Sequence, residues 1–184
     1  MRGPYASSGR YGYDAAYPNG VQANCTTTPC TFSGAGRAAT QKTHFVTVDE
    51  NLSPYGIARH RHAPEIDQEL ALLGADVRSQ FTPHLLPIDQ GELVSCYVRT
   101  DGDVDARALY RDAYAAEPWV EVVEGPPGMT EVRETNFCRI SLHEDPLRLI
   151  VFATIDNLYK GTSSQAVQNL NLMFGLDESL GLPA

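Results

Sequence analysis

The distribution of apolar and polar residues divides most of the chain into short strands and three helices. Apolar runs that alternate or are continuous, as in strands, occupy residues 44–48, 77–82, 85–100 (broken at 89–91), 119–123, 135–143 and 147–155. Apolar residues at helical spacing predict helices over residues 64–73, 104–115 and 161–174. Strands outnumber helices and most connections are short. This order predicts an α+β fold, a mixed and largely antiparallel sheet with helices on one face.

The first 32 residues follow a different pattern. They are rich in Gly, Ser, Thr, Pro and Tyr, and Val21 is their only Val, Ile or Leu. No helical or alternating period passes through their tyrosines, so we expect residues 1–32 to be disordered or irregular. Residues 33–184 are expected to form one domain.

Composition and charge exclude some classes of protein. The net charge of −9 argues against a nucleic-acid partner or an anionic membrane, because both require a concentrated basic face. No apolar run approaches the roughly 20 residues that cross a bilayer, and no secretory signal follows Met1. We therefore expect a cytoplasmic protein with reduced cysteines. The spacing of Cys25, Cys30, Cys96 and Cys138 does not predict a metal site.

The stretch His60-Arg61-His62 has the greatest potential for chemistry. Imidazole exchanges protons near neutral pH, and guanidinium binds carboxylate and phosphate through a planar fork. Pro64 and Glu65 follow at once and favour the first turn of a helix. The stretch thus places groups for proton transfer and anion binding at one helix start. Taken alone, the two histidines are also compatible with surface or core positions, and Glu65 with a purely structural role.

A small-residue loop, Ser33-Gly34-Ala35-Gly36-Arg37, is a second candidate site. Its glycines let the backbone approach a ligand, and its N–H groups together with Arg37 can hold an oxyanion. Most loops of this composition are only turns, so this loop is evidence for a binding site only together with the other motifs of the chain.

Those motifs form an ordered series, which is far more specific than any one motif alone. The series is SGAGR at 33–37, HRHAPEI at 60–66, FTPHLLP at 81–87, EPWV at 117–120 and NFC at 136–138, followed by DNL, KG and QAVQN within residues 156–169. In this series the chain resembles the N-acetyl-gamma-glutamyl-phosphate reductases, from Ser33 to about Glu178.

The resemblance implies an architecture and a reaction. Enzymes of this family are built like glyceraldehyde-3-phosphate and aspartate-semialdehyde dehydrogenases. An NADP-binding Rossmann domain precedes an α+β domain that carries much of the substrate site and the oligomer interface, and a C-terminal helix returns to the cofactor domain. In arginine biosynthesis they interconvert N-acetylglutamyl 5-phosphate and N-acetylglutamate 5-semialdehyde. A cysteine thiolate attacks the acyl phosphate, phosphate leaves, NADPH reduces the thioester, and a histidine handles the proton.

The resemblance also implies roles for particular residues and the partners of the chain. The implied proton-transfer group is His60 or His62. The residues implied to bind the anionic acyl phosphate are Ser33, Gly34, Arg37, Arg61 and Glu65, and those implied to lie at NADP are Asn157, Lys160 and Gln165. Lys160 is equally compatible with a solvated position at a helix start. The implied protein partner is a second copy of the chain or a full-length subunit.

Two features depart from the family pattern. No strand, glycine-rich turn and helix of a Rossmann domain precede Ser33, and residues 1–32 are too few to form one. The nearest match to the nucleophile is Cys25, but seven residues separate it from Ser33, which leaves no room for the expected intervening helix and strand. Cys25 is therefore the candidate nucleophile, with Cys30 second, whereas Cys96 and Cys138 are expected to be core thiols.

These departures leave three hypotheses open. The chain acts as a reductase once the missing half is supplied, serves as a non-catalytic oligomerising domain, or is a degenerate product with no role. The change in composition at Ser33 is consistent with a shifted or rearranged gene start, so that Met1 is not the original start.

Overall fold

The computed structural model describes residues 22–36, 38, 40–72, 79–99, 105–145 and 148–184, and for residues 22–30, 32 and 145 it describes the backbone. The strands are β1 (Gln22–Thr31), β2 (Ser53–Pro54), β3 (Pro83–Leu86), β4 (Glu92–Arg99), β5 (Val120–Val122), β6 (Cys138–Asp145) and β7 (Arg148–Ile155). The α-helices are α1 (Phe45–Val48), α2 (His62–Leu72), α3 (Ala106–Tyr114) and α4 (Ser164–Met173). Short 3-10 turns lie at Phe32–Ala35, Gln41–Thr43 and Met129–Glu131, and a π turn lies at Tyr159–Ser163.

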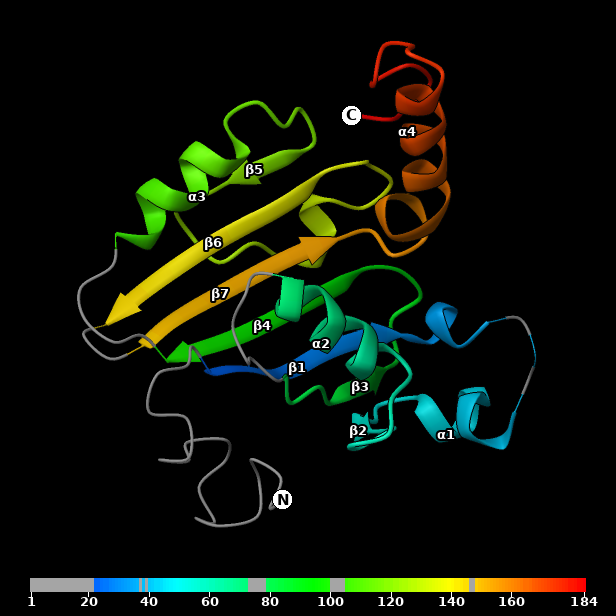
Figure 1. Cartoon of the computed structure of the whole chain (residues 1–184). Coiled ribbons are helices and arrows are strands. Elements are labelled where there is room, and N and C mark those ends of the chain that lie inside the picture. Colours follow the sequence, from blue (N-terminus) through cyan, green and yellow to red (C-terminus); the bar gives the residue numbers. More distant parts are fainter. Residues whose placement is uncertain (1–21, 37, 39, 73–78, 100–104, 146–147) are drawn as a thin grey trace.

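The strands form one sheet in the order β2-β3-β1-β4-β7-β6-β5 (Figure 1). β1 pairs in parallel with β3 and β5 with β6, and all other neighbours are antiparallel. The ladder from β4 through β7 to β6 has continuous register, with Ile155 opposite both Glu92 and Cys138. The predicted mixed, largely antiparallel sheet is confirmed, and the apolar strand β7 lies inside it.

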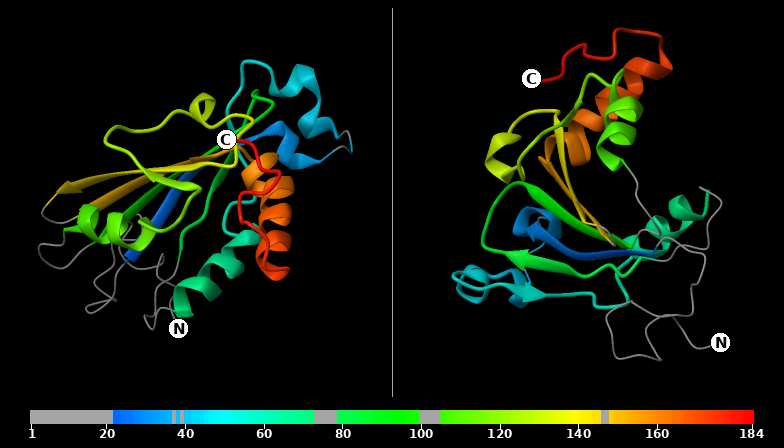
Figure 2. Two further views of the ribbon diagram at one scale, coloured as in Figure 1. Left: turned by 90° about the horizontal axis from the view of Figure 1, so that it is seen from above. Right: turned by 90° about the vertical axis from the view of Figure 1, so that its left-hand side faces the viewer.

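The hydrophobic core lies between the sheet and α3. Alternation along the strands sends every second side chain to this face, and Ala106 of α3 packs there at 3% exposure. The core cluster is Ala106, Ile140, Leu142, Leu149 and Val151, with Cys96 and Val98 of β4 packed against it. Figure 2 shows α2, α3 and α4 on the same side of the sheet, as predicted for helices on one face.

Residues 22–31 form a strand, which corrects the prediction that all of residues 1–32 are irregular. The backbone of β1 pairs with β4 on one side and β3 on the other. Its sequence, QANCTTTPCT, lacks the apolar alternation of a typical strand. Hydrogen bonds to two neighbours stabilise a strand whatever its local propensity. The aromatic residues of positions 1–21 lie outside the described residues.

Residues 44–48 form a helical turn and not the predicted strand. Nδ1 of His44 accepts the N–H of Val46 at 3.3 Å, and the His44 carbonyl accepts the N–H groups of Thr47 and Val48. Phe45 and Val46 are 71% and 79% exposed, so the apolar pattern does not reflect burial within this chain. Local capping bonds therefore outweigh strand propensity here.

The strand predicted at 77–82 lies further along, because β3 begins at Pro83. Proline is tolerated as the first residue of a strand, and its carbonyl accepts the N–H of Tyr55 at 3.0 Å. Before it, Ser79 donates both its N–H and its Oγ hydrogen to Oδ1 of Asp67 on α2, at 2.6 and 2.9 Å. These bonds hold residue 79 to α2. Residues 77 and 78 lie outside the described part.

The final helix, predicted over residues 161–174, is formed by α4 and the π turn before it, and α4 buries a polar face. Ser164, Gln168 and Asn171 are its buried residues. The predicted apolar face, which includes Leu170, is exposed: 49% for Leu170, 81% for Met173 and 71% for Phe174. Helix α4 thus packs against the protein through polar groups and presents its apolar side outward. In the described part of the chain, no helix has the length and apolarity of a membrane span.

Candidate functional site

The His60-Arg61-His62 stretch enters α2 beside a group of aromatic rings. The His60 ring lies 4.7 Å from the His62 ring, 5.1 Å from Phe81 and 5.5 Å from Tyr55, centroid to centroid. Gly56 has φ +58°, and a Cβ there would lie 3.0 Å from the His60 ring, so glycine permits this approach. The two histidines lie together at the start of α2, as the sequence predicted.

The two imidazoles have different environments. Nδ1 of His60 accepts the backbone N–H of His62 at 3.3 Å, which assigns the proton of neutral His60 to Nε2. Burial lowers the pKa of His60, and the charges of His62 and Arg61 lower it further, while Glu65 opposes them. His60 is half-buried, whereas His62 and Arg61 are exposed. His60 is thus biased to the neutral form, and Arg61 is free to meet an anion from solvent.

A carboxylate that the sequence analysis did not select lies near this pair. Glu92 is the first residue of β4 and has the same parity as Cys96 and Val98, so it points to the helix-covered face of the sheet. Burial raises the pKa of Glu92, and the charge of His62 acts against that rise. An acid at the start of an apolar strand was the available sequence signal.

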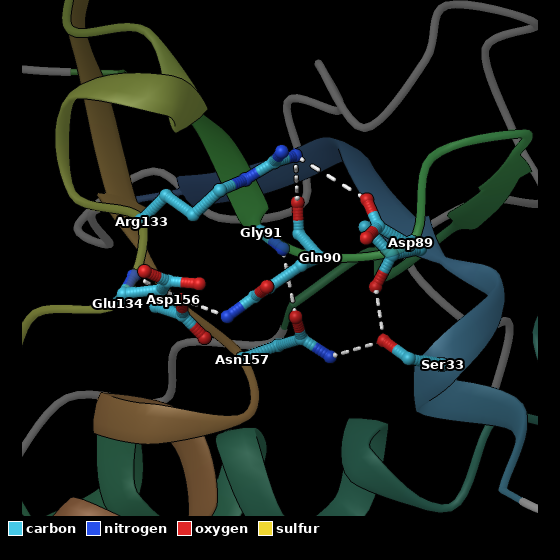
Figure 3. A network of polar contacts seen from close by, with 9 residues as sticks. Ser33, Asp89, Gln90, Gly91, Arg133, Glu134, Asp156 and Asn157 are labelled. Carbon is cyan, nitrogen blue, oxygen red and sulfur yellow. Dashed lines mark hydrogen bonds and ion pairs between the residues drawn. The ribbon is translucent and has the colours of Figure 1, made fainter.

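Asn157 joins three segments that are distant in sequence. Its Oδ1 accepts the N–H of Gly91 at 2.8 Å, and its Nδ2 donates to Oγ of Ser33 at 3.0 Å (Figure 3). Ser33 Oγ also lies 2.9 Å from Oγ1 of Thr31. Two residues assigned to different ligands, Ser33 for substrate and Asn157 for cofactor, are thus directly bonded to each other.

Asp156 is the centre of the buried polar network in Figure 3. It is 0% exposed, and its Oδ2 accepts Gln90 Nε2 at 2.5 Å and the N–H of Glu134 at 2.7 Å. Its Oδ1 accepts the N–H groups of Leu158 and Tyr159 at 2.8 and 3.0 Å. Asp156 therefore fixes the end of β7 and, with it, Asn157. Sequence reasoning missed it, although an acid directly after an apolar strand is a recognisable signal.

The Ser33 loop is exposed beyond its first residue. Phe32–Ala35 form a 3-10 turn, and Gly36 follows with φ +81°. A Cβ at Gly34 or Gly36 would meet no described atom within 4 Å, so the backbone is open on that side. Arg37 lies outside the described residues. The loop geometry leaves Gly34 accessible to a ligand.

The other residues assigned to the cofactor are engaged elsewhere. Lys160 donates from Nζ to Oε1 of Gln168 at 2.6 Å, and that oxygen also accepts Nδ2 of Asn136 at 3.0 Å. Burial lowers the pKa of Lys160. Gln165 donates to Oδ1 of Asn169 at 2.9 Å. These side chains form internal bonds and do not converge with Asn157 on one cradle, so the described residues do not fit NADP by themselves.

The described parts of the cysteines do not show the surroundings that activate a thiolate. The backbone of Cys25 lies within β1, opposite Cys96, and not at a helix N-terminus that would lower a thiol pKa. Burial raises the pKa of Cys138, with Lys160 acting in the opposite direction. Cys96 and Cys138 are half-buried and form no disulfide, as expected for core positions. In the described ranges no group of three or more His, Cys, Asp or Glu side chains is arranged to hold a metal ion.

Comparison with known proteins places this geometry in a family. Residues 15–157 match the family described as semialdehyde dehydrogenase, dimerisation domain. That match begins upstream of Ser33 and includes β1. The chain is 48% identical over 161 residues to the N-acetyl-gamma-glutamyl-phosphate reductase of Desulforudis audaxviator, covering 82% of this chain and 46% of that protein. The Methanocaldococcus jannaschii protein of the same name is 47% identical over 156 residues, with the same coverage.

Solved structures agree on the fold. Aspartate semialdehyde dehydrogenase II from Vibrio cholerae, complexed with ASA, matches with a TM-score of 0.65 and 18% identity, covering 84% of this chain and 55% of that one. A probable aspartate-semialdehyde dehydrogenase from Pseudomonas aeruginosa matches with a TM-score of 0.65 and 19% identity, covering 83% and 55%. The chain spans about half the length of the curated relatives it matches. It belongs to the semialdehyde dehydrogenase family through its dimerisation domain, and its sequence is similar to that of N-acetyl-gamma-glutamyl-phosphate reductases.

Proposed function

We propose that this chain supplies the proton-transfer and anion-binding part of a cytoplasmic, NADP-dependent N-acetyl-gamma-glutamyl-phosphate reductase, which converts N-acetylglutamyl 5-phosphate to the 5-semialdehyde. The observation that carries this proposal is the His60-Arg61-His62 group at the start of α2, in a chain 48% identical to such a reductase. The described residues do not form a dinucleotide site. NADP is therefore held by another part of the assembly.

The environments of the two histidines support different roles. Nδ1 of His60 is occupied by a backbone N–H, so its neutral ring can only donate, from Nε2. We assign the exchangeable proton to His62, which is exposed. Arg61 is exposed at the same turn and suits the phosphate or carboxylate of the substrate. The other residues that we assign to substrate binding are Ser33, Gly34, Arg37 and Glu65.

A chimeric enzyme tests this function. The portion of the Desulforudis audaxviator reductase that matches this chain is replaced by this chain's own residues, and NADPH consumption is followed with N-acetylglutamyl phosphate. The chimera is expected to turn over, while the chain alone shows no turnover and binds NADP weakly by calorimetry. A chimera that binds NADP but does not turn over contradicts the proposal. A low-micromolar dissociation constant of NADP from the isolated chain contradicts the proposal that another part of the assembly holds NADP.

The outward apolar side of α4 favours a second function, a non-catalytic domain that associates with a full-length subunit. Leu170, Met173 and Phe174 are exposed on a helix whose polar residues point inward. Solvent-facing apolar patches of this kind mark interaction surfaces. The matched family is itself described as a dimerisation domain. If the chain associates normally with a full-length subunit but the chimera shows no turnover, this second function is favoured over the first.

Replacing Met173 with glutamate is expected to weaken association, because a charge on an apolar interface must be desolvated on binding. Sedimentation of the chain, alone and mixed with the full-length relative, gives the fraction in complex. Leu109→Glu is the matched control, because Leu109 is 59% exposed on α3. Equal association of both variants excludes α4 as the contact surface.

A further inference from the structure

We propose that Asn157 is a positioning residue for Ser33: its side-chain amide donates to Oγ of Ser33 and so leaves the hydroxyl hydrogen of Ser33 for the anionic group of the substrate. This inference rests on the proposed function, which assigns Ser33 to substrate binding. The orientation of the Ser33 hydroxyl by Asn157 is a physical claim that is testable without turnover.

The orientation of the Asn157 amide is fixed by a backbone group. The N–H of Gly91 can only donate, and it lies 2.8 Å from Oδ1 of Asn157 (Figure 3). The amide oxygen therefore faces Gly91, and the amide nitrogen faces Ser33, whose Oγ lies 3.0 Å from Nδ2. Because an amide nitrogen only donates, Ser33 Oγ is the acceptor of this bond.

Asn157 is itself held in place by the buried network. Asp156, which is 0% exposed, accepts Nε2 of Gln90 at 2.5 Å, so two consecutive residues of one segment are bonded to two consecutive residues of the other. Gly91 has φ +115°, and a Cβ there would lie 3.0 Å from Cβ of Met129, so this turn requires glycine. A side chain that is fixed in this way can position another one.

Ser33 lies at the start of an open loop. It is half-buried, and the three residues that follow it, 34–36, are exposed. A Cβ at Gly34 or Gly36 would meet no described atom within 4 Å, so the loop is open to a ligand on that side. Thr31, which is 2% exposed, places its Oγ1 2.9 Å from Ser33 Oγ. Ser33 thus joins the buried network to the open loop.

The hydrogen of the Ser33 hydroxyl decides what this loop can bind. A hydroxyl has one hydrogen and two lone pairs. Asn157 occupies one lone pair, and either hydroxyl of Thr31 and Ser33 can donate to the other. When Thr31 donates, both lone pairs of Ser33 are occupied and its hydrogen is left for a ligand that accepts. The phosphate and carboxylate of N-acetylglutamyl phosphate are strong acceptors of this kind.

The substitution Asn157→Asp separates positioning from simple structural support. Aspartate has the shape of asparagine and still accepts the N–H of Gly91, but its second oxygen accepts where Nδ2 donates. The Ser33 hydroxyl is then expected to turn its hydrogen toward the new carboxylate and away from a ligand. A role limited to holding Gly91 and Ser33 together survives this change, whereas a role in directing the Ser33 hydrogen is lost.

Nitrogen-15 NMR of the full chain tests the orientation. Ser33→Ala removes the acceptor of Nδ2, so one Nδ2 proton signal of Asn157 is expected to move upfield. Ser179→Ala is the matched control, because Ser179 is an exposed serine whose partner is Asp177. If Ser33→Ala perturbs folding, as judged by circular dichroism, Ser33→Gly replaces it. Asn157 signals that move no more in the folded Ser33 variant than in the control overturn the proposal.

The chimeric reductase tests the purpose of the bond. Ser33→Ala and Asn157→Asp are each expected to raise KM for N-acetylglutamyl phosphate about tenfold or more, as loss of a hydrogen bond to a charged group does, with kcat changed about twofold or less. KM for NADPH is expected to stay within about twofold of the wild-type value. Asn51→Asp is the control for the added charge and is expected to change neither KM, because Asn51 is exposed and its Nδ2 donates to the Thr47 carbonyl.

The double variant shows whether Asn157 acts through Ser33. Combining Ser33→Ala with Asn157→Asp is expected to raise KM for the acyl phosphate no more than about twofold beyond the larger single effect. Effects that multiply overturn the proposal, and so does an Asn157→Asp chimera with a wild-type KM or with a change in KM for NADPH alone. A chimera without turnover refutes the proposed function, and the NMR comparison then decides alone whether Asn157 orients Ser33.

Discussion

Replacing Asp156 with alanine is expected to lower the free energy of unfolding by about 3 kcal/mol or more. The side chain is fully buried, and its two oxygens accept four hydrogen bonds, from Gln90 Nε2 and from the N–H groups of Glu134, Leu158 and Tyr159. Alanine leaves these buried donors without an acceptor, and an orphaned donor costs more than a lost bond contributes. Urea denaturation of the wild-type and variant chains measures the difference.

The effect of Asp156→Ala should extend to its loop. Glu134 adopts φ +61°, a left-handed conformation that is unfavourable for a residue with a side chain, and its N–H is held by Asp156. Without the carboxylate this turn is expected to relax and release Asn157 from Gly91. Asp177→Ala is the control, because Asp177 also accepts two hydrogen bonds, both from Ser179, but lies on the surface. Equal losses in the two variants contradict a central role for Asp156.

Replacing His62 with alanine in the chimeric reductase is expected to lower kcat/KM by about 100- to 10,000-fold, the range typical of a general acid–base group. The loss follows from the assignment of the exchangeable proton to His62 and not to His60, whose Nδ1 accepts a backbone N–H. His60→Ala is expected to lower the rate less, through the position of the His62 turn. Steady-state kinetics across pH, with NADP binding as a check of folding, measure both effects.

The control for the histidine series is His143→Ala. His143 is an exposed histidine of β6, outside the group of rings formed by Tyr55, His60, His62 and Phe81. Its replacement is expected to leave the kinetics unchanged. A His62→Ala chimera as active as the His143→Ala chimera would assign proton transfer to another group.

The strands and the candidate site could be predicted from sequence where the residues that reveal them lie close together along the chain. β4, β6 and β7 alternate or are uniformly apolar because they are buried in a sheet, and α2 begins with residues that favour a first turn. The predicted pair His60 and His62 lies together because two residues separated by one position at a helix start remain close whatever the fold does.

Prediction failed where a distant segment provides the stabilising bonds. β1 has a polar sequence and is a strand because β3 and β4 flank it. Residue 79 is bonded to Asp67 of α2, so the sheet begins later, at Pro83. In the 45–48 turn, Phe45 and Val46 are apolar but exposed, and periodicity cannot distinguish a core strand from an apolar surface.

By itself, the sequence determined the family and the α+β class and singled out the His60-Arg61-His62 motif, because ordered motifs and side-chain periodicity are local properties of the chain. Only the tertiary structure decided that Ser33 and Asn157 bond to each other and that Asp156 is the centre of a buried network. It also decided that α4 turns its apolar side outward. The physical reason is common to all three: each depends on contacts between elements far apart in sequence, whose register and facing are set by packing and not by local propensity.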